Sequence, residues 1–199
     1  MNINKSILIL FSIAFIYTIS LFIAPITLEE KTVQNLDGNA NMIDFSEKWE
    51  ELPFYHMLIY TFSDFNCHQK HERSYSINQN QIPVCARDVG VFIGISLGLF
   101  VMSFVRPRKD YKEVIFSLLP VKFDLNKRWK TVFIFILGAI FVLPLVLDGG
   151  IQLITSYEST NPLRTATGLL FGIAFSVFIS SLLISSFAEL SDFRKSTTR

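Results

Sequence analysis

Four long blocks of apolar residues limit the possible folds of this chain more than any other feature. They cover residues 6–24, 89–105, 131–147 and 165–188. A helix needs roughly 17–25 apolar residues to cross a hydrocarbon core about 30 Å thick, and each block falls within that range. Only 18% of the residues are charged, which is low for a soluble domain. The sequence therefore predicts an all-α membrane protein, a bundle of four transmembrane helices.

The first block has two interpretations. Lys5 gives it the basic flank of a signal peptide, but its 19 uncharged residues exceed the roughly 7–15 of a signal-peptide core. We therefore expect a retained membrane anchor. A further aromatic stretch, residues 54–65, is too short to cross a bilayer. We expect it to form a helix that lies in the membrane interface or leans on the bundle.

The distribution of Lys and Arg predicts the orientation of the bundle. Residues 106–130 hold eight basic residues and three acids, whereas residues 26–88 hold five basic residues and ten acids. Because Lys and Arg are retained in the cytoplasm, the loop 106–130 and both termini are expected there. The outer loops are then 25–88, which forms a small extracytoplasmic cap containing the interfacial helix, and 148–164. Residues 1–199 are thus expected to form one multi-pass domain of the cell membrane.

Charge balance and small residues indicate what the chain contacts. The 18 basic and 17 acidic residues are nearly balanced, which argues against binding to nucleic acid. Membrane lipids and other membrane protein subunits are the expected partners. Glycines recur every four residues in the second and fourth blocks, where they allow helix backbones to approach closely in lipid. Packing within the chain is favoured over dimerisation; these glycines are Gly90, Gly94, Gly98, Gly168 and Gly172.

Polar side chains that could bind a metal or an anion occur in two sets, both expected at the outer face of the membrane. The first set precedes the second block and comprises Cys67, His68, Arg73, Cys85, Arg87 and Asp88. The second set follows the third block and comprises Asp148, Gln152, Asn161 and Arg164. The two sets are far apart in sequence but share one membrane depth. They are therefore predicted to form a single site.

The first set offers the ligands of a metal site. Cys67, His68, Cys85 and Asp88 supply two sulfurs, an imidazole and a carboxylate, which can hold zinc tetrahedrally. Copper accepts the same imidazole and thiolate ligands, so the residues do not separate the two metals. His71 is a spare ligand. The pattern favours instead a disulfide between the two cysteines, on a side expected to be oxidising, which would contribute about 3 kcal/mol, and two free thiols are the third possibility. A metal held by both sulfurs and a disulfide exclude each other.

The arginines of both sets have two interpretations. Together with Asn161 they could bind an anionic lipid headgroup through bidentate hydrogen bonds. Because unpaired charges are costly near a membrane, we expect at least one arginine to pair with Asp88 or Asp148 instead. Asp148 and Gln152 share a helical face if the third helix continues beyond Pro144, and they would then bridge helix ends.

Four short motifs in this order resemble a known family. They read CHQ–x3–RS, PVCARD–x–G, DGGxQ and ESTNPLR–x2–TG. Over residues 54–187 the chain is similar to domain-of-unknown-function family 2085, a family of predicted integral membrane proteins. The resemblance implies a small multi-span membrane protein and brings no established activity. The family pattern reads CARC, whereas this chain has Asp88 in place of the last cysteine, so a three-cysteine metal site is in doubt.

Familiar catalytic signatures are missing, since the chain has no GxSxG, HExxH, P-loop or GxGxxG motif. The leading hypothesis is therefore a non-catalytic accessory or structural subunit of a membrane complex, with an outward-facing Cys/His/Asp/Arg site that could bind zinc or copper. The alternative is a membrane enzyme or carrier that acts on an anionic lipid at the outer leaflet.

Overall fold

The computed structural model describes residues 4–119 and 126–197, and four long apolar helices dominate it. Each is long and apolar enough to cross a membrane. They are α1 (Lys5–Thr27), α4 (Ala86–Ser103), α6 (Lys127–Ile154) and α7 (Asn161–Thr197). The predicted all-α fold with four candidate spans is confirmed.

Helices α6 and α7 extend well beyond the apolar blocks from which they were predicted. Helix α6 has 28 residues and α7 has 37. Helix α6 runs through Pro144 and continues to Ile154. A proline inside a helix removes one backbone hydrogen bond, which membrane helices tolerate better than soluble ones. Asp148 and Gln152 therefore lie on a continuous helix, as their shared face requires.

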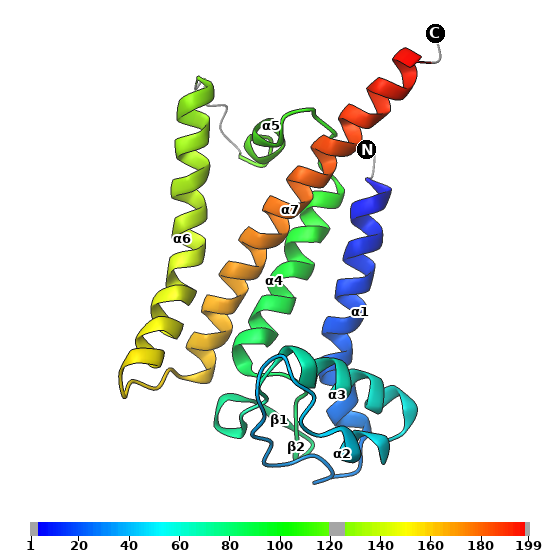
Figure 1. The fold of residues 1–199 in the computed structure, drawn as a ribbon, viewed down its shortest axis with the longest axis vertical. Coiled ribbons are helices and arrows are strands. Elements are labelled where there is room, and N and C mark those ends of the chain that lie inside the picture. The colour runs from blue at the N-terminus through cyan, green and yellow to red at the C-terminus, as the bar shows by residue number, and fades with distance from the viewer. Residues whose placement is uncertain (1–3, 120–125, 198–199) are drawn as a thin grey trace.

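The helices alternate in direction, which gives the molecule two distinct ends (Figure 1). Helix α1 begins, α7 ends and the short helix α5 (Tyr111–Phe116) lies at one end, here called the α5 end. The segment between α1 and α4 and the connection from α6 to α7 lie at the other, here called the cap end. The basic loop and the polar sets of the sequence thus occupy opposite ends.

The glycines form the contact between α4 and α7. A Cβ added to Gly90 would lie 2.0 Å from the carbonyl oxygen of Thr165. One added to Gly168 would lie 2.1 Å from the carbonyl oxygen of Arg87. Real Cβ atoms do not approach so closely, so only glycine permits these helices to meet backbone to backbone. The expectation that the glycines pack within the chain is confirmed, and this contact sets Arg87 beside the start of α7.

The cap is a small folded unit that leans on the ends of α1 and α4. Its elements are α2 (Ser46–Glu50), α3 (Phe54–Asn66), the 3₁₀ turn η1 (His71–Arg73), β1 (Ser76–Ile77) and β2 (Asn80–Gln81). The short aromatic helix expected at residues 54–65 is α3. It contacts the bundle through a hydrogen bond of 2.9 Å between the hydroxyls of Tyr17 and Ser63. Its other face exposes Phe54, Leu58 and Phe62.

The core of the cap joins its helices to its hairpin. Trp49 and Tyr60 stack with their ring centroids 5.0 Å apart, and both are fully buried. Trp49 Nε1 donates to Asp64 at 2.8 Å, and the Tyr60 hydroxyl donates to the carbonyl of Gln81 at 2.8 Å. Burial raises the pKa of Asp64. This core holds β2, which leads into α4, against α3. Residue Cys67 of the predicted site directly follows α3.

Candidate metal centre

Cys67 and Cys85 lie at the facing ends of two helices. Cys67 is the residue that ends α3, and Cys85 is the residue that precedes the first turn of α4. Their exposed fractions are 3% and 6%. The backbone N–H of Cys85 donates to the sulfur of Cys67 at 3.2 Å. The two segments therefore already meet at the cysteines.

Gln69 links the segment that follows α3 to the segment that precedes α4. Its Nε2 donates to the carbonyl of Pro83 at 2.6 Å, and its side chain is fully buried. Its φ of 48° places it in the left-handed region, which non-glycine residues rarely adopt. This turn reverses the chain directly after Cys67, and it directs the Gln69 amide toward the strand that leads to Cys85. Gln69 belongs to the CHQ motif of the sequence, which indicated no role for it.

Three ligand atoms converge between these segments. The ligand atoms of Cys67, His68 and Cys85 all lie within 4.8 Å of one another. Both cysteines are free thiols in the structure. Asp88, in the first turn of α4, accepts a hydrogen bond of 3.3 Å from Cys85 Sγ but is not part of the three-atom group. In a tetrahedral zinc site, ligand atoms lie about 3.3–3.8 Å apart, given metal–ligand bonds of about 2.0–2.3 Å.

Burial fixes the protonation of these ligands. A side-chain hydrogen bond with Cys85 and burial both raise the pKa of the Cys67 thiol. Burial lowers the pKa of His68. Without a metal, Cys67 is therefore a protonated thiol and a weak nucleophile at neutral pH, and a bound metal would displace its proton. His68 is a neutral imidazole, the form that coordinates a metal.

A second cluster begins one residue before Asp88. Arg87 Nη2 pairs with Asp148 Oδ2 at 2.6 Å, and the Asp148 side chain is only 5% exposed. The hydroxyl of Tyr157 donates to the other carboxylate oxygen of Asp148 at 3.3 Å. This contact joins α4 to α6 near their ends. It is the ion pair that sequence analysis expected for at least one arginine.

Glu158 is the centre of the remaining polar contacts. Arg73 pairs with one of its carboxylate oxygens at 2.7 Å, and Arg164 pairs with the other at 2.8 Å. The amide of Gln152 donates to the same carboxylate. Desolvation acts to raise the pKa of Glu158, but Arg73 and Arg164 outweigh it and lower that pKa. All three partners of Glu158 were predicted site residues, whereas Glu158 itself was not.

Arg164 and Asn161 connect this cluster to the cap. Arg164 is 3% exposed, and its Nη1 donates to Asn161 Oδ1 at 2.9 Å. Asn161 Nδ2 in turn donates to the carbonyl of Ser74 at 3.1 Å. The two polar sets of the sequence therefore meet at the cap end. They form two neighbouring clusters, a Cys–His–Cys group and an arginine–carboxylate group.

Four apolar helices with a polar cap define a class, the small multi-pass membrane proteins. The chain belongs to the family DUF2085, described as "predicted membrane protein", whose model matches residues 67–178. It is 26% identical over 164 residues to an uncharacterised protein of Methanocaldococcus jannaschii, covering 82% of this chain and 83% of that one. It is 33% identical over 116 residues to an uncharacterised protein of Methanothermobacter thermautotrophicus, covering 58% and 86%. No solved structure matches.

Proposed function

We propose that this membrane protein binds a transition metal in its cap, through Cys67, His68 and Cys85 with Asp88 as the fourth ligand. Zinc and copper both fit two sulfurs, an imidazole and a carboxylate. The observation that carries the proposal is the convergence of three ligand atoms within 4.8 Å from two separate segments. A contraction of about 1 Å would bring these atoms to tetrahedral distances.

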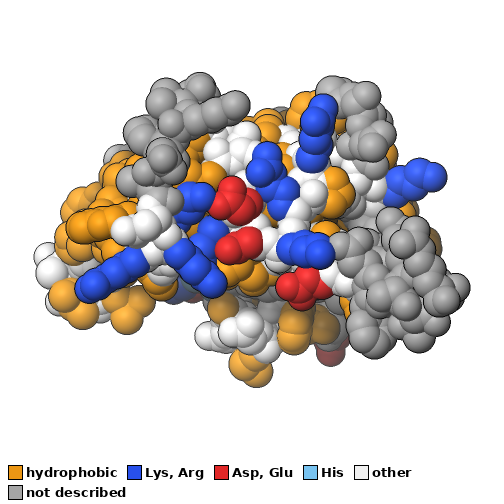
Figure 2. Space-filling view, turned by 90° about the horizontal axis from the view of Figure 1, so that it is seen from above, with side chains coloured by type: hydrophobic (Ala, Val, Ile, Leu, Met, Phe, Trp, Pro, Cys, Tyr) orange, Lys and Arg blue, Asp and Glu red, His pale blue; other side chains and the backbone are white. Residues whose placement is uncertain are grey.

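The proposed role is that of a non-catalytic accessory subunit of a membrane complex. Burial and the contact with Cys85 raise the pKa of the Cys67 thiol, which makes it a poor nucleophile without a metal and favours a structural or carrier site over nucleophilic catalysis. The excess of Lys and Arg in residues 106–130 favours an α5 end in the cytoplasm and a cap that faces outward. Figure 2 looks onto the α5 end, where basic side chains outnumber acidic ones.

Metal content tests the proposal directly. Protein purified in mild detergent without chelator is expected to contain about one equivalent of zinc or copper, as a four-ligand site requires. Cys67→Ser, Cys85→Ser and His68→Gln should each lose it, whereas His71→Gln should keep it. His71 is the matched control because it lies in the same segment but outside the converging group. Elemental analysis and a thiol count on the same samples provide the measurement.

The other outcomes of this experiment overturn the metal site. Wild-type protein with neither metal nor free thiols would have a Cys67–Cys85 disulfide, and the cap would then be structural. Metal that survives all three ligand substitutions would lie elsewhere. Two free thiols that take up no zinc or copper on titration would equally exclude the site.

Gln69 provides a second test, because it positions a ligand without binding metal. Gln69→Leu keeps the volume but removes the hydrogen bond to Pro83. We expect it to lower the metal affinity about tenfold or more, as the loss of a supporting hydrogen bond does in metal sites. Gln34→Leu is the control, since Gln34 is exposed and donates to the carbonyl of Gln79 at the cap surface. Competition with a chelator of known affinity measures both variants. Equal affinities would show that Gln69 has no positioning role.

The lipid-headgroup alternative is less well supported by the contacts. Arg73 and Arg164 share the carboxylate of Glu158, and Arg87 pairs with Asp148. A guanidinium that is already in an ion pair offers less charge to an anionic headgroup. We therefore assign the arginine–carboxylate cluster to joining the cap with α6 and α7.

A further inference from the structure

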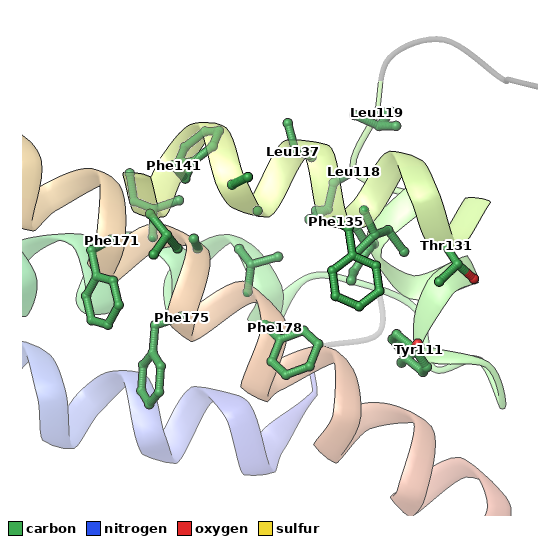
Figure 3. A pocket seen from close by; sticks show the side chains of 18 residues that line it. Tyr111, Leu118, Leu119, Thr131, Phe135, Leu137, Phe141, Phe171, Phe175 and Phe178 are labelled. Atoms are coloured by element: carbon green, nitrogen blue, oxygen red, sulfur yellow. The ribbon is translucent and has the colours of Figure 1, made fainter. Parts of the chain in front are cut away.

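A large apolar cleft lies between α6 and α7, away from both polar clusters. Its volume is about 720 Å³, which falls within the range of roughly 300–1,000 Å³ typical of ligand sites. Phenylalanines of both helices line it (Figure 3), and residues of α5 line one end. They are Phe135, Phe141, Phe171, Phe175 and Phe178.

The length of the cleft matches one leaflet of a bilayer. On α6 its lining runs from Thr131 to Val142, which spans about 16 Å at the rise of an α-helix. Half of a hydrocarbon core of about 30 Å is a similar distance. The cleft begins beside α5 and ends well before Asp148. It therefore lies in the leaflet at the α5 end.

Gly138 shows that the cleft is open to an occupant. A Cβ added to this residue would have no heavy atom within 4 Å, although Gly138 lies in the middle of α6 and lines the cleft. Only 6% of the most apolar 18-residue stretch of α6 is buried within the protein. An empty space of this kind would leave its lining without van der Waals contacts.

Two lysines, Lys112 and Lys130, lie near the end of the cleft beside α5. Lys112 Nζ donates to Thr131 Oγ1 at 2.6 Å, and both Thr131 and Tyr111 line the cleft. Among the described residues no carboxylate pairs with Lys112. Lys130, the residue before Thr131, pairs with Glu113. The wider α5 end is also basic (Figure 2). The cleft thus combines an apolar groove of one leaflet's depth with a positive rim.

We propose that the cleft binds one hydrocarbon chain of an anionic phospholipid from the leaflet at the α5 end, with the headgroup at Lys112. Lipid tails are as apolar as the phenylalanines, so apolar contact alone does not select one lipid over another. The headgroup charge supplies the preference, because basic residues near a membrane surface attract anionic lipids. This site is independent of the proposed metal centre.

Two variants with the same substitution test the site. Gly138→Phe fills the cleft, whereas Gly150→Phe adds the same side chain to α6 at a position with equally open surroundings outside the cleft. Each protein is reconstituted into vesicles of phosphatidylglycerol and phosphatidylcholine, and the lipid retained on release is counted by native mass spectrometry. We expect Gly138→Phe to lower the retained phosphatidylglycerol at least about tenfold, because the ring replaces the contacts of the chain. Gly150→Phe should retain as much as the wild type.

The headgroup contact has its own variant. Lys112→Gln should remove the preference for phosphatidylglycerol over phosphatidylcholine while a lipid chain is still retained. Equal retention by Gly138→Phe and wild type would overturn the proposal. So would a wild-type preference for neither lipid, or a protein dimer without lipid that Gly138→Phe alone abolishes, since a second copy of the chain would then cover the cleft.

Discussion

Gly90→Ala is expected to destabilise this protein by about 3 kcal/mol, the upper end of the usual cost of overpacking, although it adds one methyl group. That methyl would lie 2.0 Å from the carbonyl oxygen of Thr165, on the backbone of the facing helix. A backbone cannot turn away as a flexible side chain can, so α4 and α7 would have to separate along their whole contact. We expect a large fall in the yield of monodisperse protein and in its thermal midpoint in detergent. Size-exclusion chromatography with a thermal-shift assay measures both.

Gly150→Ala is the matched control for this substitution. It makes the same change in a membrane helix where the new methyl has no neighbour within 4 Å. We expect no loss of stability there, since alanine is the better helix former. If Gly90→Ala were as stable as Gly150→Ala, the two helices would not meet backbone to backbone at this point.

Asp148→Asn is the second substitution with a large expected effect. It leaves Arg87 without its counter-charge at a contact where the carboxylate is 5% exposed. Removing one partner of a buried ion pair costs about 3 kcal/mol, and the Arg87 side chain that remains is only 24% exposed. Chemical or thermal unfolding of the variant in detergent should show this loss. Arg87→Gln should do the same, since it leaves Asp148 unpaired.

The double variant separates the ion pair from the packing around it. Asp148→Asn combined with Arg87→Gln should be more stable than the sum of the two single losses predicts, because no unpaired charge then remains. Asp37→Asn is the control for a charge lost at the surface. Asp37 is 73% exposed and pairs with Lys70 at 3.4 Å, so its loss should cost less than about 0.5 kcal/mol. Additive single losses would show that Arg87 and Asp148 are not coupled.

The membrane-spanning part of the fold was predictable because its signals are long and local. An apolar block of 17 or more residues forms a helix in lipid, and glycines at every fourth residue of such a helix indicate close packing against another helix. The hairpin of the cap was not predicted. Its turn places Asn78 and Gln79 at φ values of 51° and 57°, which glycine usually supplies. Without that signal, two strands of two residues each leave no pattern to detect.

The candidate site was predictable in composition but not in its connections. Residue type and spacing selected Cys67, His68 and Cys85, because few other side chains bind transition metals. The roles of Gln69 and Glu158, which the motifs contain, were not predicted because they depend on contacts with other segments of the chain. Gln69 reaches Pro83, and Glu158 reaches Arg73 across 85 residues. The importance of a polar residue that joins two segments is therefore decided by tertiary structure.

Helix α6 differs from its three companions in what holds it in place. Within its apolar window only 6% of the residues are buried, against 50% for α4, which lies between α1 and α7. Helix α6 therefore makes most of its side-chain contacts with the surrounding lipid or detergent and few with the rest of the protein. Its tilt, and with it the width of the gap beside α7, will respond to the lateral pressure of whatever surrounds it. A detergent micelle and a native bilayer are thus not equivalent media for this molecule.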